Sequence, residues 1–230
     1  MSWIKGIQKA WIDLSTYCNA ACPQCHRTNP NGLEKADWLK LIQWDLDEFK
    51  KAFPRHMLDA IKEFEICGTW GDPCMNKDIF KICEYIIKNS KIPKISISTN
   101  GSMRDELWWW ELGIMCRDRL NVIFTVDGIN QEMHEKYRQK TDLATILHHM
   151  ETVVESSAQA EGFTVVFKHN ENYIDQIAQM CYDRGAGHKW TSSDRWDDGD
   201  IFKYKDENNN EHILEKSTSV YKSYGLSNAD

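Results

Sequence analysis

The sequence predicts an α/β protein built on a partial, open (β/α)6 barrel. Six strand-like runs alternate with helix-like stretches along the chain, which is typical of parallel strands joined by right-handed crossovers. The strands also alternate apolar with polar side chains, so one face of the sheet is predicted to be polar. Six units are too few for the usual closed barrel of eight, and the barrel is therefore expected to stay open.

The expected elements follow one another at regular spacing. The strands are predicted at Trp11–Thr16, Phe64–Thr69, Lys94–Asn100, Leu120–Asp127, Phe163–Asn170 and His188–Ser193. The helices are predicted at Asp45–Ala52, Lys77–Asn89, Arg104–Met115, Thr141–Ser157 and Tyr173–Arg184. In the last four helices the apolar residues recur near i, i+3 and i+4, the period of an amphipathic helix.

The alternation within the strands bears on function. Ile95 and Ile97 alternate with Ser96 and Ser98, whereas a parallel sheet is normally apolar on both faces. If helices cover the apolar face, the polar face lines a cavity that holds a ligand. The alternative is a doubly wound sheet with some polar residues in its core.

Length and charge limit the class of protein. A chain of 230 residues forms one large domain or at most two. We expect the barrel over residues 1–193 and a polar C-terminal extension over residues 194–230, which forms a small hairpin, a lid over the barrel, or the remnant of a further domain. The 35 acidic and 28 basic side chains give a net charge of −7, so a large nucleic acid is not an expected partner.

The chain shows no membrane or export signal. No apolar run approaches the ~18 residues of a membrane helix, and the first thirty residues lack the apolar centre of a secretory signal. We therefore expect a cytoplasmic protein without membrane contact. In that compartment its eight cysteines are expected to be reduced thiols or metal ligands.

Three of these cysteines form a compact motif. Cys18, Cys22 and Cys25 make a CxxxCxxC directly after the first strand. Three thiolates at this spacing can hold three irons of a [4Fe–4S] cluster and leave the fourth iron open to a ligand. Such a cluster is expected to be oxygen-sensitive. One alternative is a zinc site with His26 as fourth ligand. The alternative of another class is a zinc or iron–sulfur module without catalytic activity.

The cysteine motif resembles that of the radical S-adenosylmethionine (radical SAM) superfamily, whose fold is a partial (β/α)6 barrel. Three further motifs occur in family order at strand ends: residues 68–73 resemble "GGEP", residues 99–101 "TNG" and residues 125–128 "SVDG". The resemblance covers residues 8–190 and is greatest to short members of the SPASM/twitch type. Past Cys116 the chain has only Cys181, so no auxiliary cluster is expected.

The resemblance implies a reaction. A low-potential electron donor, similar to flavodoxin or ferredoxin, reduces the cluster, and S-adenosylmethionine is cleaved to methionine and a 5′-deoxyadenosyl radical. The radical abstracts hydrogen from a substrate, expected to be a peptide or protein side chain or a small metabolite. The alternative substrate is a nucleoside or an RNA base.

The resemblance also implies residues that bind S-adenosylmethionine. Backbone groups at residues 70–72 would receive its amine, and polar side chains at later strand ends would bind the ribose, the methionine end and the carboxylate. The full set is Gln24, Trp70, Gly71, Asp72, Ser98, Asn100, Asp127, Lys168 and Asn170. Gln24 stands where the family commonly has an aromatic residue. The structural alternatives are a tight turn at Gly71, a helix cap at Asn100 and a turn carboxylate at Asp127.

Further candidates come from the residues themselves. Glu65 and Cys67 are predicted to face the cavity, and Asp13 on the first strand invites the same interpretation. Because a buried carboxylate is costly unless it is paired or solvated, Glu65 is expected either to face substrate or to pair with Lys168. In the third helix, the tryptophans on either side of Trp109 each group with other apolar residues. Trp109 belongs to neither group and is predicted to be exposed.

Overall fold

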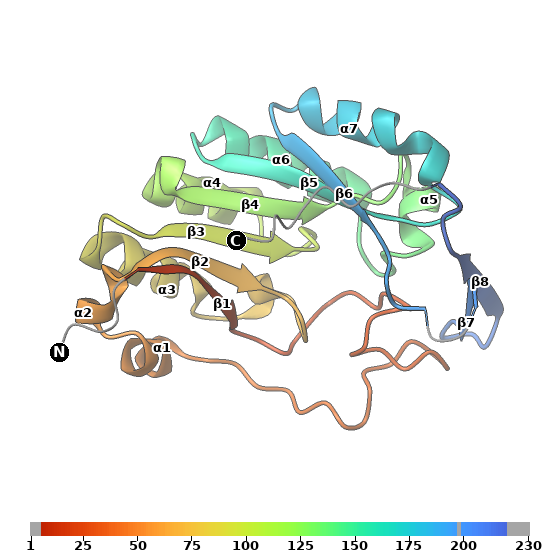
Figure 1. The fold of residues 1–230 in the computed structure, drawn as a ribbon, viewed down its shortest axis with the longest axis horizontal. Coiled ribbons are helices and arrows are strands. Elements are labelled where there is room, and N and C mark those ends of the chain that lie inside the picture. The colour runs from red at the N-terminus through yellow and green to blue at the C-terminus, as the bar shows by residue number, and fades with distance from the viewer. Residues whose placement is uncertain (1–5, 197–198, 220–230) are drawn as a thin grey trace.

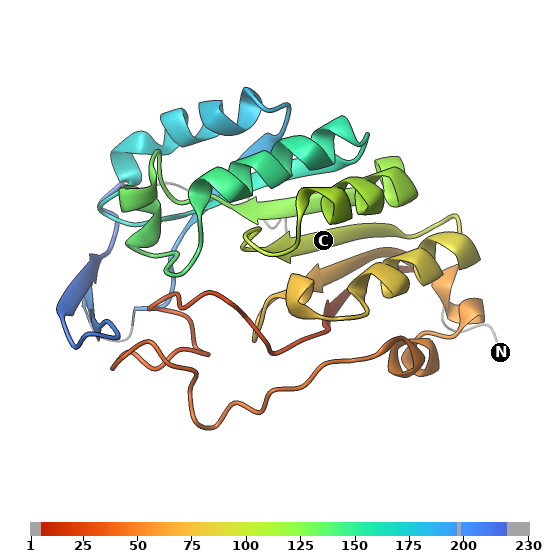
Figure 2. The ribbon, with the colours of Figure 1, turned by 180° about the vertical axis from the view of Figure 1, so that it is seen from behind.

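The computed structural model describes residues 6–196 and 199–219. Six parallel strands form one sheet in the order β1-β2-β3-β4-β5-β6, and helices cover one face of this sheet (Figures 1 and 2). A sequential order means that each crossover returns to the neighbouring strand on the same side. The partial open barrel is therefore confirmed, and the doubly wound alternative is wrong.

The structure contains all the predicted elements. The strands of the sheet are β1 (Ile7–Asp13), β2 (Ile61–Cys67), β3 (Lys94–Thr99), β4 (Leu120–Thr125), β5 (Gln159–Val166) and β6 (Gly187–Ser192). The helices are α1 (Leu46–Ala52), α2 (Arg55–Leu58), α3 (Ile79–Asn89), α4 (Glu106–Cys116), α5 (Gln131–Glu135), α6 (Leu143–Glu155) and α7 (Ile174–Tyr182). The short helices α2 and α5 were not predicted. Several strands end before the predicted residue, so the motif residues lie in the loops that follow.

The two faces of the sheet differ as the alternation predicts. Ile66 and Ile97 are fully buried in the core beneath the helices. Glu65 and Ser98, whose side chains point to the opposite face, line a cavity. One face therefore supplies the core and the other supplies the site.

Capping aspartates fix the start of three helices. The side chain of Asp45 accepts the backbone N–H of Glu48 before α1, and Asp105 does the same for Trp108 before α4. Asp142 caps α6 in the same way. Each cap satisfies an N–H group that has no partner within the helix.

Helix α4 differs from the prediction. Trp109 is fully buried against Phe124, with 5.4 Å between ring centroids, and its indole donates to the Met103 carbonyl at 3.1 Å. Trp110 and Leu107 are exposed instead. Because α4 is apolar around most of its circumference, its sequence does not show which face packs on the sheet. The predicted exposure of Trp109 is wrong.

Beyond β6 the chain forms an antiparallel hairpin of β7 (Ile201–Lys205) and β8 (Glu211–Glu215). The hairpin lies beside the cysteine loop that follows β1 (Figure 1). The rest of the predicted extension, residues 197–198 and 220–230, lies outside the described residues. Among the helices that the structure describes, none is long and apolar enough to cross a membrane.

Candidate active site

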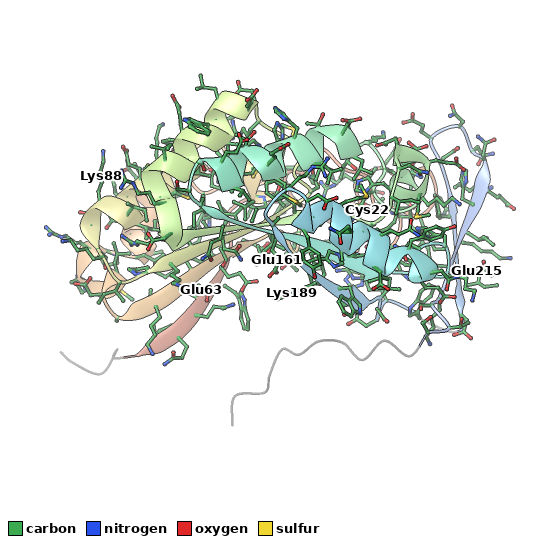
Figure 3. All side chains as sticks on the ribbon, turned by 90° about the horizontal axis from the view of Figure 1, so that it is seen from above. Cys22, Glu63, Lys88, Glu161, Lys189 and Glu215 are labelled. Carbon is green, nitrogen blue, oxygen red and sulfur yellow. The ribbon has the colours of Figure 1, made fainter. Side chains whose placement is uncertain are left out.

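A cavity of about 460 Å³ lies at the carboxyl ends of the strands, and Cys18, Cys22 and Cys25 all line it. Ligand sites in parallel α/β barrels collect at this end because the loops converge there. Figure 3 shows Cys22 toward the end of the molecule that carries Glu215 of β8, with Lys88 at the opposite end. The topology thus brings the cysteine motif onto the polar face of the sheet.

Nitrogen donors surround two of the three sulfurs. Arg138 Nη1 donates to Cys22 Sγ at 3.8 Å. The amide of Asn100 donates to Cys18 Sγ at 3.8 Å, as does the backbone N–H of Ala20 at 3.4 Å. Hydrogen bonds to the sulfurs are one means by which a protein tunes the potential of an iron–sulfur cluster.

Burial keeps the free thiols protonated. It raises the pKa of Cys18 to about 12 and also raises the pKa of Cys22. Metal binding reverses this state, because the metal displaces the proton and takes the thiolate. Three cysteine sulfurs that line one cavity, two of them with nitrogen donors, fit a [4Fe–4S] cluster.

The structure does not support the alternative of a zinc site with His26 as fourth ligand. His26 is exposed, and its ring lies 6.3 Å from that of Trp70. His26 does not line the cavity. Among the described residues, no three His, Cys, Asp or Glu side chains form a group for a single metal ion. The predicted zinc site with His26 is not formed there.

The glycine-rich loop after β2 packs against the cysteine loop. A Cβ at Gly71 would lie 2.2 Å from the carbonyl oxygen of Ser15, so only glycine permits this approach. The N–H of Asp72 donates to the Tyr17 carbonyl at 2.7 Å. Gly71 therefore serves a structural turn and also lines the cavity. Trp70 does not line the cavity, because its ring packs edge-on against Trp38 at 5.2 Å.

Asp72 joins the second and third motifs. Its buried carboxylate accepts the Thr99 hydroxyl at 2.9 Å, the Asn100 N–H at 2.7 Å and the Cys74 N–H at 2.9 Å. Burial raises the pKa of Asp72, and these hydrogen bonds oppose the rise. The side chain is fully engaged, which leaves the backbone of the loop for a ligand.

Ser98 and Asn100 both line the cavity. The Asn100 amide donates to Asn19 Oδ1 at 2.8 Å, and this bond links the third motif to the cysteine loop. The N-cap of α4 is Asp105. The helix-cap interpretation of Asn100 is therefore wrong.

Asp127 does not reach the cavity. Its carboxylate is fully buried, pairs with Arg138 and accepts the N–H of Val165 at 2.6 Å. Arg138 lines the cavity in its place. Although burial lowers the pKa of Arg138, the neighbouring Asp127 raises it and keeps the guanidinium charged. The Asp127 carboxylate is thus engaged with Arg138 and Val165, and it does not line the cavity.

Three cavity residues escaped the sequence analysis. Arg138 lies 11 positions after Asp127 and looks like a surface arginine in the sequence. The Arg138 guanidinium lies over the Tyr137 ring, with 4.7 Å between Arg138 Cζ and the ring centroid. The Thr125 hydroxyl is buried without a hydrogen-bond partner among the described residues. Because buried hydroxyls normally have a partner, this one is available to a group bound in the cavity.

Lys168 and Asn170 are placed elsewhere. Lys168 Nζ contacts Glu171 at 2.5 Å and the Thr218 hydroxyl at 2.7 Å. The buried Asn170 amide donates to the carbonyl oxygens of Asp127 and Val165. Neither residue lines the cavity, so the expectation that one of them meets a carboxylate there is wrong. The reason is that β5 ends at Val166, and both residues belong to the turn beyond it.

The substrate candidates separate into two groups. Glu65 and Cys67 line the cavity, whereas Asp13 does not and accepts the Thr69 N–H at 2.8 Å. Glu65 pairs with Lys9 at 2.6 Å, so its predicted pairing with Lys168 is wrong. Lys9 lies on the adjacent strand β1 and on the same face of the sheet, which explains the choice of partner.

His134 supports the Asp127–Arg138 pair. Its Nδ1 accepts the N–H of Asp127 at 3.2 Å, so the ring proton lies on Nε2 and is donated to the Thr141 hydroxyl at 3.0 Å. Thr141 in turn donates to the Arg138 carbonyl at 2.6 Å. One neutral histidine thus connects the backbones of both charged residues.

This arrangement predicts a loss of stability in mild acid. Burial lowers the pKa of His134 to about 4. Because this pKa lies below the unfolded value of ~6.5, the stability is complete above about pH 6.5 and falls as the pH drops toward 4. The free energy of unfolding in urea should decrease between pH 7 and pH 5, and His134→Gln should flatten part of this dependence.

Only part of the dependence is expected to disappear, because burial also lowers the pKa of His169 and of His188 to about 4. His56→Gln is the matched control, since His56 is exposed on α2, outside the hydrogen bonds of His134. An unchanged slope in His134→Gln would contradict the prediction.

The family comparison agrees with the geometry. Residues 12–181 match the model of the Radical SAM superfamily, and the chain belongs to this superfamily. It is therefore a radical SAM enzyme, and the cofactors of this class are a [4Fe–4S] cluster and S-adenosylmethionine. Membership of this superfamily contradicts the alternative of a metal module without catalytic activity.

Individual relatives are more distant. The chain is 24% identical over 181 residues to a probable GTP 3′,8-cyclase of Methanocaldococcus jannaschii, a match that covers 78% of this chain and 57% of the relative. The chain thus spans little more than half the length of that curated relative.

Solved structures share the fold. Streptococcus suis SuiB bound to precursor peptide SuiA superposes with a TM-score of 0.64 at 14% identity, over 82% of this chain and 40% of SuiB. Native anSMEcpe with bound AdoMet gives a TM-score of 0.63 at 18% identity, over 81% of this chain and 52% of anSMEcpe.

Proposed function

We propose that the chain cleaves S-adenosylmethionine reductively and uses the product radical to abstract hydrogen from a peptide or protein side chain or a small metabolite. The observation that carries the proposal is the single cavity lined by Cys18, Cys22, Cys25 and Arg138, together with the unpartnered hydroxyl of Thr125. When bound, the cluster supplies the electron for cleavage of the sulfonium. The chain supplies binding, orientation and exclusion of water.

We assign the binding groups as follows. The three cysteines hold the cluster, and the Gly71 backbone admits the amine of S-adenosylmethionine. Arg138, charged and buried, meets the carboxylate together with Thr125, in place of the residues predicted from the sequence. Ser98 remains the donor for a ribose hydroxyl group, and Asn100, whose amide already donates to Asn19 and Cys18, lines the site beside it.

Glu65 and Cys67 are the candidates for substrate contact. Both line the cavity from β2, and a substrate amide or hydroxyl group can hydrogen-bond to either. The peptide held by the SuiB structure supports a peptide substrate, since the two proteins share the fold. Reduction by a low-potential donor, similar to flavodoxin or ferredoxin, belongs to the same proposal.

A nucleotide is the second candidate substrate. It is favoured by the relative described as a probable GTP 3′,8-cyclase. A triphosphate needs several cations, and Arg27, Arg138 and Arg195 line this cavity. Arg27 donates to three backbone carbonyl oxygens, Arg138 pairs with Asp127, and Arg195 donates to the Gln24 carbonyl. Because all three arginines already have partners, the first candidate is better supported.

We also propose a cytoplasmic location. All eight cysteines are free thiols, as a reducing compartment requires. The same compartment supplies low-potential donors.

The proposal predicts reductant-dependent formation of 5′-deoxyadenosine. The protein is reconstituted anaerobically with iron and sulfide, mixed with S-adenosylmethionine and dithionite, and analysed by chromatography. Deuterated peptides and deuterated GTP are then compared by transfer of deuterium into 5′-deoxyadenosine. Protein that carries a full cluster but forms no product with either substrate class, and does not bind S-adenosylmethionine, would overturn the proposal.

A further inference from the structure

The C-terminal extension packs directly on the cysteine loop. Tyr204 of β7 and Leu214 of β8 are buried in a small apolar cluster that includes Ala20, Ala21 and Cys22. This cluster is separate from the main core beneath the helices. The burial of Cys22 thus depends in part on a segment nearly two hundred residues later in the chain.

Backbone hydrogen bonds fasten the hairpin on both of its strands. The N–H of Lys205 donates to the Pro30 carbonyl at 2.8 Å, and the N–H of Gly32 donates to the Lys205 carbonyl at 3.0 Å. On the other strand, the Lys168 N–H donates to the Glu215 carbonyl at 2.9 Å. The hairpin is therefore fixed to the cysteine loop at one edge and to the turn after β5 at the other.

Tyr204 also orders the loop that carries Arg138. Its hydroxyl donates to the Lys136 carbonyl at 3.3 Å and accepts the Gln139 amide at 3.2 Å. The Gln139 carbonyl in turn accepts the N–H of Ala21 at 3.1 Å. Tyr204 thus holds the 136–139 loop, and that loop in turn holds the cysteine loop next to Cys22.

The segment that leads to the hairpin makes a second attachment. The Gln24 amide donates to the Arg195 carbonyl at 2.5 Å, and its Oε1 accepts the Ser193 hydroxyl at 2.5 Å. Gln24 is buried and directly precedes Cys25. At a position where the family commonly has an aromatic residue, this chain ties its extension to the cysteine loop.

We propose that residues 193–196 and 199–216 form an integral cover of the cysteine loop, with Tyr204, Leu214 and Gln24 as positioning residues. The cover holds the loop in the geometry that binds a cluster and shields its thiols from water and oxygen. The loop lacks helices and strands of its own between β1 and α1, so contacts from elsewhere must order it. The importance of the cover for catalysis rests on the proposed function, whereas its shielding of the thiols does not.

The test measures thiol exposure in the cluster-free, reduced full chain. Alkylation of each cysteine by iodoacetamide is followed by peptide mass spectrometry. Leu214→Ala should speed the alkylation of Cys22 at least tenfold, whereas Ile213→Ala should leave it unchanged. Ile213 is the matched control because it lies on the same strand with its side chain 55% exposed.

Cys181 is the internal standard, since it is fully buried in the main core and should stay protected. Equal Cys22 rates in the two variants would overturn the proposal. If Leu214→Ala also exposes Cys181, the whole chain has unfolded and Tyr204→Phe decides, because it removes only the hydroxyl. This variant should speed Cys22 alkylation several-fold. An unchanged rate of Cys22 alkylation would overturn the proposal of a cover.

A second readout uses the reconstituted protein in air. Leu214→Ala should shorten the half-life of the cluster absorbance relative to Ile213→Ala, because oxygen reaches the sulfurs more easily. A protein that shows the thiol effect but never cleaves S-adenosylmethionine would retain the cover and lose the proposed function. A protein that cleaves S-adenosylmethionine but shows equal thiol protection in the two variants would retain the proposed function and lose the cover.

Discussion

Replacing Cys22 by alanine is expected to remove the [4Fe–4S] cluster and reduce 5′-deoxyadenosine formation to the background without enzyme. Two thiolates cannot replace three as ligands of the cluster irons, and no electron then reaches the sulfonium. Cys22 is also the most buried of the three ligands, so solvent cannot readily supply a substitute ligand. Iron and sulfide content, visible absorbance and chromatography measure the effect.

Cys67→Ala is the matched control. Cys67 lines the same cavity but lies outside the cysteine motif, and its thiol makes only long contacts, with the Ile12 carbonyl at 3.8 Å and Thr69 at 3.9 Å. The variant should keep its cluster. A full cluster in Cys22→Ala, or equal cluster loss in the two variants, would contradict the assignment of the ligands.

Asp127→Asn is expected to lower the free energy of unfolding by about 3–5 kcal/mol. Breaking a buried ion pair leaves the other charge without a partner, and this is costly in the interior. Here the remaining charge is Arg138, whose side chain is 13% exposed, while that of Asp127 is fully buried. Urea unfolding of the cluster-free protein, analysed by linear extrapolation, measures the change.

Glu84→Gln provides the comparison for an exposed pair. Lys88 and Glu84 lie one helical turn apart on α3, with side chains 68% and 40% exposed, and such pairs contribute about 0.3–0.5 kcal/mol. The double variant Asp127→Asn/Arg138→Met should recover part of the loss, because it removes the unpaired charge. Equal effects of Asp127→Asn and Glu84→Gln would show that the buried pair does not stabilise the fold.

The architecture could be predicted from the sequence because its signals are local. Strand alternation such as Ile95-Ser96-Ile97-Ser98 reports which side chains share a face, and alternating strands and helices imply a parallel sheet. The spacing of Cys18, Cys22 and Cys25 likewise lies within eight residues. These features need no knowledge of the remaining chain.

The partners of charged side chains could not be predicted. The sequence placed Asp127 at a strand end but did not show that Arg138 neutralises it, and it did not pair Glu65 with Lys9. Both pairs depend on which loops and strands become neighbours. A buried charge takes the partner that the fold brings within reach, so its role was decided only when the loops were in place.

The sequence by itself determined the superfamily, a parallel sheet of six strands and the three cysteines proposed as cluster ligands. Only the tertiary structure decided which polar residues line the cavity, that Arg138 and Thr125 are among them, and that Gln24 binds Ser193 from 169 positions away. The reason is physical: periodicity and motif spacing act over a few residues, whereas burial and hydrogen-bond pairing depend on distances that exist only in the folded chain.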